Sequence, residues 1–535
     1  MTKYLNHFSI LAILLIGVGF ANAQSNPHKN AIKFGEVIGY ISQMYVDSVN
    51  DTEITEKAIV NMLSELDPHS SYIPPDDVDD ANERINGSFV GIGIRFQILK
   101  DTLLVVQPIS NGPSEKVGLL PGDKIIEIED VLVAGVGLKN SQVREKLLGE
   151  KGTKVRVKIQ RNGSDKLLDF TITRDKIPVY SVDASYMVTP TTGYIKLNSF
   201  SRTSLDEVRT GIIALKKEGM ENLILDLQGN GGGLLYAAQK IADEFLSDDK
   251  LVVYSEGRAQ SRQELRSGDK GHWEKGKLVL LTDEYSASAS EIVSGAIQDW
   301  DRGLIVGRRT FGKGLVQRPI NLSDGSQIRL TIARYYTPGG RFIQKPYDDN
   351  ENYRSDILDR YKNGEFSNAD SIKFPDSLKM STLLTKRTVY SGGGIMPDIF
   401  VPLDTTGNNL LYRALSRSGV FNTFALNYVN KNRSKLEKEY KTFDEFKSQF
   451  SCEGKILDEF YEEFISENPE FEYTEEDMIE ASALIQTRLK ATFARDLWGT
   501  SEFYQIYNDN NEILLKAIQV MEEGEYNTIK LAANF

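Results

Sequence analysis

Three serines alternate with alanine in the segment DEYSASASEIVSGAIQDW, as Ser286, Ser288 and Ser290. The preceding run KLVLLTD is typical of a buried strand, and the residues that follow show apolar side chains at helical spacing. The serines therefore lie at a predicted strand-to-helix turn. Such a turn lifts a side chain off the sheet edge and leaves the first N–H groups of the helix without partners. This position suits a hydroxyl that attacks a carbonyl carbon.

A serine hydroxyl needs a neighbour that removes its proton, and histidine is the usual base. None of the four histidines lies close in sequence to the serine turn. A buried lysine can replace histidine if its pKa falls from ~10.4 to roughly 7–8. The segment FGKGLVQ, which follows the strand-like GLIVG, supplies Lys313 between two glycines and Gln317 four residues later. Alone, GKG is more typical of a turn, so its pairing with the serine turn carries the interpretation.

The oxyanion of an acyl-transfer reaction needs fixed N–H donors. The N–H of Ala289, directly after Ser288, is one candidate. A second source is the glycine-rich turn in DLQGNGGGLL, which joins a predicted strand to a helix and can direct N–H groups into a site. A phosphate-binding loop is the competing interpretation, but the segment lacks the Lys-Ser/Thr ending of that motif.

The elements that must position these residues divide the chain into regions. The first 23 residues resemble a secretory signal that ends at Ala21-Asn22-Ala23, which predicts export to the periplasm or cell envelope, although an uncleaved anchor is the alternative. Residues 24–86 show helical periodicity. Residues 87–177 show short strands and one helix, in an order that resembles a PDZ domain. Residues 178–403 alternate strands and helices as an α/β layered domain, and residues 404–535 are acidic and mainly helical.

Composition excludes several classes of function. The formal net charge of −13 disfavours nucleic acid as a partner. Cys452 is the single cysteine, so no intrachain disulfide and no cysteine-based metal site can form. His69, in the loop DPHSSYIPPDD, is interpreted as a structural or surface histidine.

Taken together, YSASASEI, FGKGLVQ, LDPHSSYI, LILDLQGNGGGLL and GGGIMPDI resemble the carboxyl-terminal processing peptidases, the tail-specific serine proteases of family S41, over residues 30–403. The resemblance implies a crotonase-like α/β protease fold with an inserted PDZ domain and no metal or organic cofactor. It makes Ser288 the nucleophile, Lys313 the general base and Gln317 the residue that positions the lysine. Gly232 and Gly233 would complete the oxyanion hole with Ala289, leaving Ser286 and Ser290 to turn and capping hydrogen bonds.

The PDZ resemblance implies that a substrate tail adds as a strand and that its terminal carboxylate meets backbone N–H groups. The residues assigned to this role are Gly91, Ile92, Gly93, Ile94, Val143 and Leu147. Two positions depart from the family pattern. Gln228 stands where an arginine is usual, and Leu147-Leu148-Gly149 lacks the arginine of Leu-Arg-Gly, which leaves a coupling route between peptide sensing and the active site in doubt.

The sequence therefore predicts an exported serine endopeptidase that cleaves polypeptides with apolar C-terminal tails. An adaptor protein and a homo-oligomer remain open as partners. Two alternatives stand beside it. One is a catalytically inactive PDZ adaptor that only binds peptides. The other is a Ser-His-Asp hydrolase that uses His69 or His272.

Overall fold

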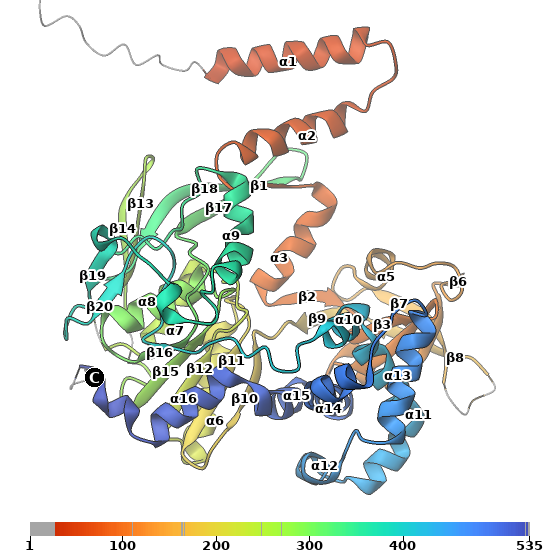
Figure 1. The fold of residues 1–535 in the computed structure, drawn as a ribbon. Coiled ribbons are helices and arrows are strands. Elements are labelled where there is room, and N and C mark those ends of the chain that lie inside the picture. The colour runs from red at the N-terminus through yellow and green to blue at the C-terminus, as the bar shows by residue number, and fades with distance from the viewer. Residues whose placement is uncertain are drawn as a thin grey trace, which may run out of the picture.

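The computed structural model describes residues 27–532 apart from positions 110, 162, 163, 165, 248, 269 and 530. The predicted signal segment lies outside the described residues. In Figure 1 four regions follow one another along the chain, beginning with helices that project from the body of the molecule. Within the described part, no helix is both long and apolar enough to span a bilayer.

The N-terminal region contains three helices and one short strand: α1 (Pro27–Met44), α2 (Asp51–Ser64), β1 (Ser71–Ile73) and α3 (Val78–Asn86). No residue of α1 is buried. The loop after α2 returns to the body, because β1 pairs antiparallel with β18 (Gln327–Tyr336). Two helices and a loop were expected here, and the structure adds α3 and this strand pairing.

The PDZ region is a mostly-β unit with its own core. Its sheet has the order β3-β4-β5-β7-β8, and β2 pairs with β9 where the chain enters and leaves. The elements are β2 (Ser88–Gly91), β3 (Ile94–Leu99), β4 (Thr102–Pro108), α4 (Pro113–Lys116), β5 (Lys124–Ile128), β6 (Val131–Leu132), α5 (Asn140–Leu147), β7 (Lys154–Gln160), β8 (Leu168–Thr173) and β9 (Asp175–Pro178).

A six-stranded sheet of order β10-β11-β12-β15-β16-β21 forms the centre of the α/β domain. All its pairings are parallel except that of β10 with β11. Its strands are β10 (Val182–Met187), β11 (Thr192–Leu197), β12 (Asn222–Asp226), β15 (Lys277–Thr282), β16 (Leu304–Gly307) and β21 (Ile399–Phe400), and the helices on one face are α6 (Ser204–Lys217), α7 (Leu235–Asp243) and α8 (Ala289–Asp299).

The two faces of this sheet are covered by distant parts of the chain. Strand residues alternate, so Leu225 and Leu280 pack with α6, α7 and α8, whereas Ile224 and Val279 pack on the opposite side. There they meet α16 (Glu512–Glu522), which crosses the sheet in Figure 1. The last helix therefore completes the core of the α/β domain, although residues 404–535 had been assigned to one separate region.

A second sheet, β1-β18-β13-β14 with β17 on β18, stands beside the first. Its strands are β13 (Leu251–Gly257), β14 (Gln260–Arg266), β17 (Leu315–Asn321) and β18, and α9 (Asn350–Lys362), β19 (Lys379–Ser381) and β20 (Thr388–Tyr390) follow it.

The remaining helices form a bundle with an aromatic core. They are α10 (Leu410–Ser418), α11 (Val420–Glu439), α12 (Phe443–Gln449), α13 (Lys455–Glu467), α14 (Glu475–Leu497) and α15 (Thr500–Tyr507). The bundle contacts the PDZ region, where Leu426 packs on Leu104 and Val106, and Arg95 pairs with Asp496 at 3.1 Å. The predicted fold class, an α/β domain with a mostly-β insertion and a helical C-terminal region, is confirmed.

Candidate active site

Ser288 lies at the turn between β15 and α8, as the sequence predicts. Its backbone has φ +56° and ψ −112°, a conformation that a residue with a Cβ adopts only under strain. Ser288 is partly exposed, whereas Ser286 and Ser290 are fully buried. The turn therefore presents one of the three hydroxyls to the outside of the domain, in the manner of a nucleophile elbow.

The two flanking serines fix this turn to the glycine-rich loop. The hydroxyl of Ser286 donates to the carbonyl of Leu227 at 2.8 Å and accepts the N–H of Asp283 at 3.0 Å. The hydroxyl of Ser290 donates to the carbonyl of Asn230 at 2.8 Å. Their predicted structural roles are consistent with these bonds, and Ser290 contacts the neighbouring loop rather than its own helix.

Lys313 precedes β17 and comes into the same site. Burial lowers the pKa of its amine, and the negative charges of Glu291 and Asp67 oppose this change. A lowered pKa gives a larger fraction of the neutral amine, which is the form that can accept a proton.

One buried carboxylate, that of Glu291, ties the two predicted catalytic segments together. One of its oxygens accepts the backbone N–H groups of Ser288 at 2.8 Å and Lys313 at 2.9 Å. The other accepts the N–H of Gly312 at 2.7 Å and the hydroxyl of Thr310 at 2.6 Å. Burial raises the pKa of Glu291 to about 7, and these hydrogen bonds oppose the rise.

A second link comes from β18. The hydroxyl of Tyr335 shares its proton between the carbonyl oxygens of Ser288, at 3.1 Å, and Lys313. Sequence analysis singled out neither Tyr335 nor Glu291. The spacing Ser288-x-x-Glu291 matches a capping box and could have drawn attention to the glutamate, whereas nothing local marks the tyrosine.

Gln317 lies in β17 opposite Thr331. Its side-chain amide donates to the Thr331 hydroxyl at 3.1 Å. The strand register shifts directly before Gln317, and such irregularities redirect side chains. Among the described residues, Gln317 makes no hydrogen bond to Lys313, so its role in positioning the lysine stays a prediction.

The glycine-rich turn lies directly against Ser288. Gly232 has φ +102°, and a Cβ there would stand 2.8 Å from the Cβ of Ser288 and 3.0 Å from the nitrogen of Ala289. The Gly232 N–H already donates to the side chain of Asn230 at 2.9 Å. The N–H groups of Gly233 and Ala289 have no acceptor within the described part of the chain. Of the three predicted oxyanion donors, these two are therefore available.

The two histidines weighed as bases occupy different places. His272 contacts Glu244 through Nδ1 at 2.8 Å, and no described contact joins it to the serine turn. His69 bonds the hydroxyl of Tyr353 at 2.7 Å. Burial and the positive charge of Lys313 lower the pKa of His69 to about 4, so it is neutral near pH 7. The charge of Lys313 therefore acts on His69, a relation that the sequence did not indicate.

The loop that carries His69 is held on β18. Asp67 accepts the N–H groups of His69 and Ser70, each at 2.8 Å. The Ser70 hydroxyl accepts the N–H of Thr331 at 3.1 Å, the same residue whose hydroxyl accepts the Gln317 amide. The N-terminal region thus closes one side of the site.

In the PDZ region, Gly91 ends β2 and Ile94 begins β3. The carbonyl of Ile92 accepts two bonds from Ser114, and the carbonyl of Gly93 accepts the N–H of Ile109. The N–H groups of Ile92 and Gly93 have no acceptor among the described residues. This arrangement is compatible with the predicted capture of a carboxylate.

Val143 and Leu147 of α5 are only 0% and 3% exposed and pack in the PDZ core. Their packing holds α5 on the sheet, and their contact with a bound peptide stays a prediction. The reason for this packing is helical periodicity: both residues point to the inner face of α5, away from the solvent.

The two departures from the family pattern also have defined surroundings. The Gln228 amide donates to Asp226 at 3.2 Å and to Asn511, just before α16, at 3.4 Å. At the end of α5, Arg174 donates to the carbonyls of Lys146 at 2.9 Å and Leu147 at 3.0 Å. An arginine therefore does reach this helix end, from the β8–β9 segment.

Comparison with known proteins identifies three regions. Peptidase family S41 matches residues 191–350 and the PDZ domain family matches residues 90–172. A family of unknown function (DUF8443) matches residues 411–499, which belong to the helical bundle.

Two curated relatives cover most of this arrangement. The carboxy-terminal-processing protease of Bartonella bacilliformis is 36% identical over 330 residues, which are 60% of this chain and 74% of the relative. The carboxy-terminal processing protease CtpB of Bacillus subtilis is 34% identical, and the matched residues are 61% of this chain and 68% of the relative.

Among solved structures, a photosystem II D1 C-terminal processing protease aligns with a TM-score of 0.35 and 25% identity, over 71% of this chain and 95% of its own. On the relatives' identity and coverage, together with the S41 and PDZ matches, the chain belongs to the S41 family of carboxy-terminal processing proteases and carries a PDZ domain.

Proposed function

We propose that this protein is a serine endopeptidase that cleaves polypeptides near their C-termini, with Ser288 as nucleophile and Lys313 as general base. The observation that carries the proposal is the shared anchoring of the two segments. The same Glu291 oxygen holds the backbone of Ser288 at 2.8 Å and of Lys313 at 2.9 Å.

In the first half of the reaction, the neutral amine of Lys313 takes the proton of the Ser288 hydroxyl as Oγ bonds to the substrate carbonyl carbon. The carbonyl oxygen becomes an oxyanion, for which the N–H groups of Gly233 and Ala289 are the proposed donors. When the intermediate collapses, the C–N bond breaks and the Lys313 ammonium gives its proton to the leaving amine. The products are a free C-terminal fragment and an acyl-enzyme on Ser288.

In the second half, a water molecule attacks the ester while Lys313 accepts one of its protons. The ester C–O bond breaks, and the lysine returns the proton to Ser288 Oγ. His69 is neutral near pH 7, so the lowering of the Lys313 pKa rests mainly on burial and not on a neighbouring imidazolium.

Recognition of the substrate tail is assigned to the PDZ domain. The unpaired N–H groups of Ile92 and Gly93 support capture of a terminal carboxylate. β3 lies at the end of its sheet, and this free edge supports addition of the tail as a strand.

Export remains part of the proposal, since residues 1–23 have the pattern of a secretory signal. Sequencing the N-terminus of protein recovered from a bacterial envelope tests it. A mature chain that begins after Ala23 is expected, and a chain that retains residues 1–23 would indicate an anchor.

The test of the activity is cleavage of an unfolded protein with an apolar C-terminal tail by the mature chain, beside Ser288→Ala, Lys313→Ala and His69→Ala variants. Circular dichroism verifies that each variant is folded. Loss of cleavage in the first two variants, with a residual rate in His69→Ala, is expected. Activity that survives in Lys313→Ala but disappears in His69→Ala would assign the base to histidine. A wild type that binds the tail without cutting it would favour the inactive adaptor.

A further inference from the structure

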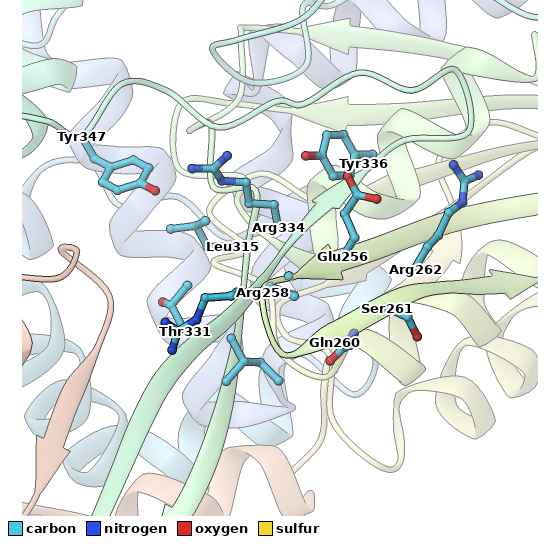
Figure 2. Close-up of a pocket in the computed structure, with 13 residues that line it drawn as sticks. Glu256, Arg258, Gln260, Ser261, Arg262, Leu315, Thr331, Arg334, Tyr336 and Tyr347 are labelled. Atoms are coloured by element: carbon cyan, nitrogen blue, oxygen red, sulfur yellow. The ribbon is translucent and has the colours of Figure 1, made fainter. Parts of the chain in front are cut away.

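A pocket of about 610 Å³ lies beside the segments that carry Lys313 and Gln317. Leu315, two residues after Lys313, is part of its wall. So is Thr331, whose hydroxyl accepts the Gln317 amide at 3.1 Å. The remaining wall comes mainly from the β13–β14 hairpin and from β18 (Figure 2). A polypeptide held at the active site therefore has this pocket as a neighbour.

The pocket is basic in a protein that is acidic overall. Its lining contains three arginines, Arg258, Arg262 and Arg334, and one acidic residue, Glu256. The whole chain has a formal net charge of −13. This local excess of positive charge attracts anions that most of the surface repels.

The three arginines differ in how far they are already engaged, and Arg334 lies over the ring of Phe342 at 5.4 Å from its centroid. Arg262 donates to Glu264 at 2.9 Å and covers the ring of Tyr254 at 3.7 Å. Arg258, at the tip of the hairpin, makes no ion pair or hydrogen bond to any described residue, and its side chain is exposed. In Figure 2 Arg258 and Arg334 extend toward the side of the pocket where Leu315 and Thr331 lie, whereas Arg262 extends away from it.

Glu256 carries one negative charge against the two positive charges of Arg258 and Arg334, and it forms no ion pair with either arginine in the described part of the chain. It stands opposite Arg334 in the β13–β18 register, and in Figure 2 its side chain turns toward Tyr336. Two guanidinium groups on one side of a pocket, with planar arrays of N–H donors, match a carboxylate, which can accept two parallel hydrogen bonds from one guanidinium.

We propose that this pocket binds a carboxylate of the polypeptide substrate through Arg258 and Arg334, close to the scissile bond. The inference rests on the proposed peptidase function and adds a preference for acidic substrates to it. The carboxylate belongs either to an Asp or Glu side chain or to the C-terminus of the chain, and the two sources are separable by experiment.

The test uses internally quenched peptides that share one apolar C-terminal tail. A single glutamate is moved one position at a time through the peptide, and each peptide has a twin with glutamine at that position. A further pair ends in a free carboxylate or a carboxamide. The variants are Arg258→Gln and Arg334→Gln, with Arg266→Gln as the matched control, because Arg266 lies on the same hairpin but outside the pocket and pairs with Glu264 at 2.9 Å.

In the wild type, one position of the glutamate is expected to raise kcat/KM about fivefold over its glutamine twin, mainly through KM, which is the size of an accessible charge-assisted contact. The ratio of kcat/KM for the glutamate peptide to kcat/KM for its glutamine twin falls toward 1 in Arg258→Gln and Arg334→Gln. It also falls toward 1 in about 1 M salt, where exposed charges are screened. The wild-type ratio is expected to persist in Arg266→Gln. If amidation, rather than the glutamate, removes the advantage in an Arg258- and Arg334-dependent way, the carboxylate is the terminal one.

The proposal would be overturned if the wild type cleaved every glutamate peptide and its glutamine twin with equal kcat/KM and also did not distinguish the free carboxylate from the carboxamide. It would also be overturned if Arg258→Gln and Arg334→Gln kept the wild-type preference. An amidation effect that survives in both variants belongs to the PDZ loop. If the wild type cleaves none of the peptides, the proposed peptidase function fails separately. The pocket is then judged from the Kd ratios of the same peptides with Ser288→Ala, measured by fluorescence anisotropy.

Discussion

The carboxylate of Glu291 accepts the backbone N–H of Lys313 at 2.9 Å with an oxygen that also accepts the backbone N–H of Ser288 at 2.8 Å. The contact joins the start of α8 to the loop before β17, which are separated by 22 residues in sequence. Since this carboxylate is fully buried, the spacing of the segments that carry Ser288 and Lys313 depends on one group, whose four donors have no other acceptor among the described residues.

Glu291→Gln is expected to lower kcat about 100-fold, since an amide can accept only at its oxygen and leaves buried N–H donors unpaired, which shifts both segments. The pH dependence of stability should change as well. The pKa of Glu291 is raised from 4.5 to about 7. Between these values the folded state holds a proton that the unfolded state releases, so this glutamate makes stability fall as pH rises.

Urea unfolding of wild type and Glu291→Gln across this pH range measures the effect. The wild-type free energy of unfolding should carry an additional slope of at most about −1.4 kcal/mol per pH unit, which the variant lacks. Glu264→Gln, a change in an exposed surface pair, is the control and should keep the slope. Parallel stability curves for wild type and Glu291→Gln would show that this carboxylate ionises normally.

The dependence of kcat/KM on pH should show a rise that levels off below the ordinary lysine pKa of ~10.4, because Lys313 acts as the neutral amine and burial lowers its pKa. Asp67→Asn removes a negative charge that opposes this shift, so the midpoint should move to lower pH. Steady-state rates with chemistry limiting provide the measurement. A profile that is flat from neutral to strongly alkaline pH, or a midpoint that Asp67→Asn moves upward, would contradict this prediction.

Gly232→Ala should reduce kcat by at least about 100-fold and lower the melting temperature. The new methyl group would lie 2.8 Å from the Cβ of Ser288, at a φ of +102° that alanine adopts poorly. Gly231→Ala is the matched control in the same turn, since a Cβ there meets no atom within 4 Å. Equal activities of the two variants would mean that the glycine-rich turn does not constrain the nucleophile.

Leu514→Ala should lower the free energy of unfolding by about 3 kcal/mol, because the side chain is 2% exposed and packs on the central sheet from α16. The neighbouring Leu515 is 50% exposed, so Leu515→Ala should change stability by less than about 1 kcal/mol. Denaturant unfolding distinguishes the two. If both variants lost a similar free energy of unfolding, Leu514 would not be the residue through which α16 packs on the sheet.

Local patterns in the sequence were sufficient for the parts of the fold and the site that depend on neighbours in the chain. The aliphatic run before Ser286 and the helical spacing after Ser290 predicted the turn that carries Ser288. The same reasoning separated the alternating strands of the PDZ region from the α/β domain.

Contacts between distant segments could not be predicted in this way. The loop with Asp67 and His69 reaches β18 across 261 residues of sequence, and its own pattern contains no sign of that partner. The pattern of residues 87–177 predicted one helix but not that its Val143 and Leu147 would be 0% and 3% exposed. The acidic, mainly helical composition of residues 404–535 likewise did not indicate that α16 would cover the central sheet.

The position of α16 determines when, during synthesis, the α/β domain can complete its core. The central sheet begins at Val182, but one of its faces is covered by Tyr504 of α15 and by residues from Ile513 onward. During synthesis, the segments with Ser288 and Lys313 therefore leave the ribosome long before the layer that buries Ile224 and Val279 exists. A nascent chain then carries Ser288 and Lys313 on a sheet with one uncovered face, so folding of the α/β domain is expected to be delayed until nearly the whole polypeptide has been made.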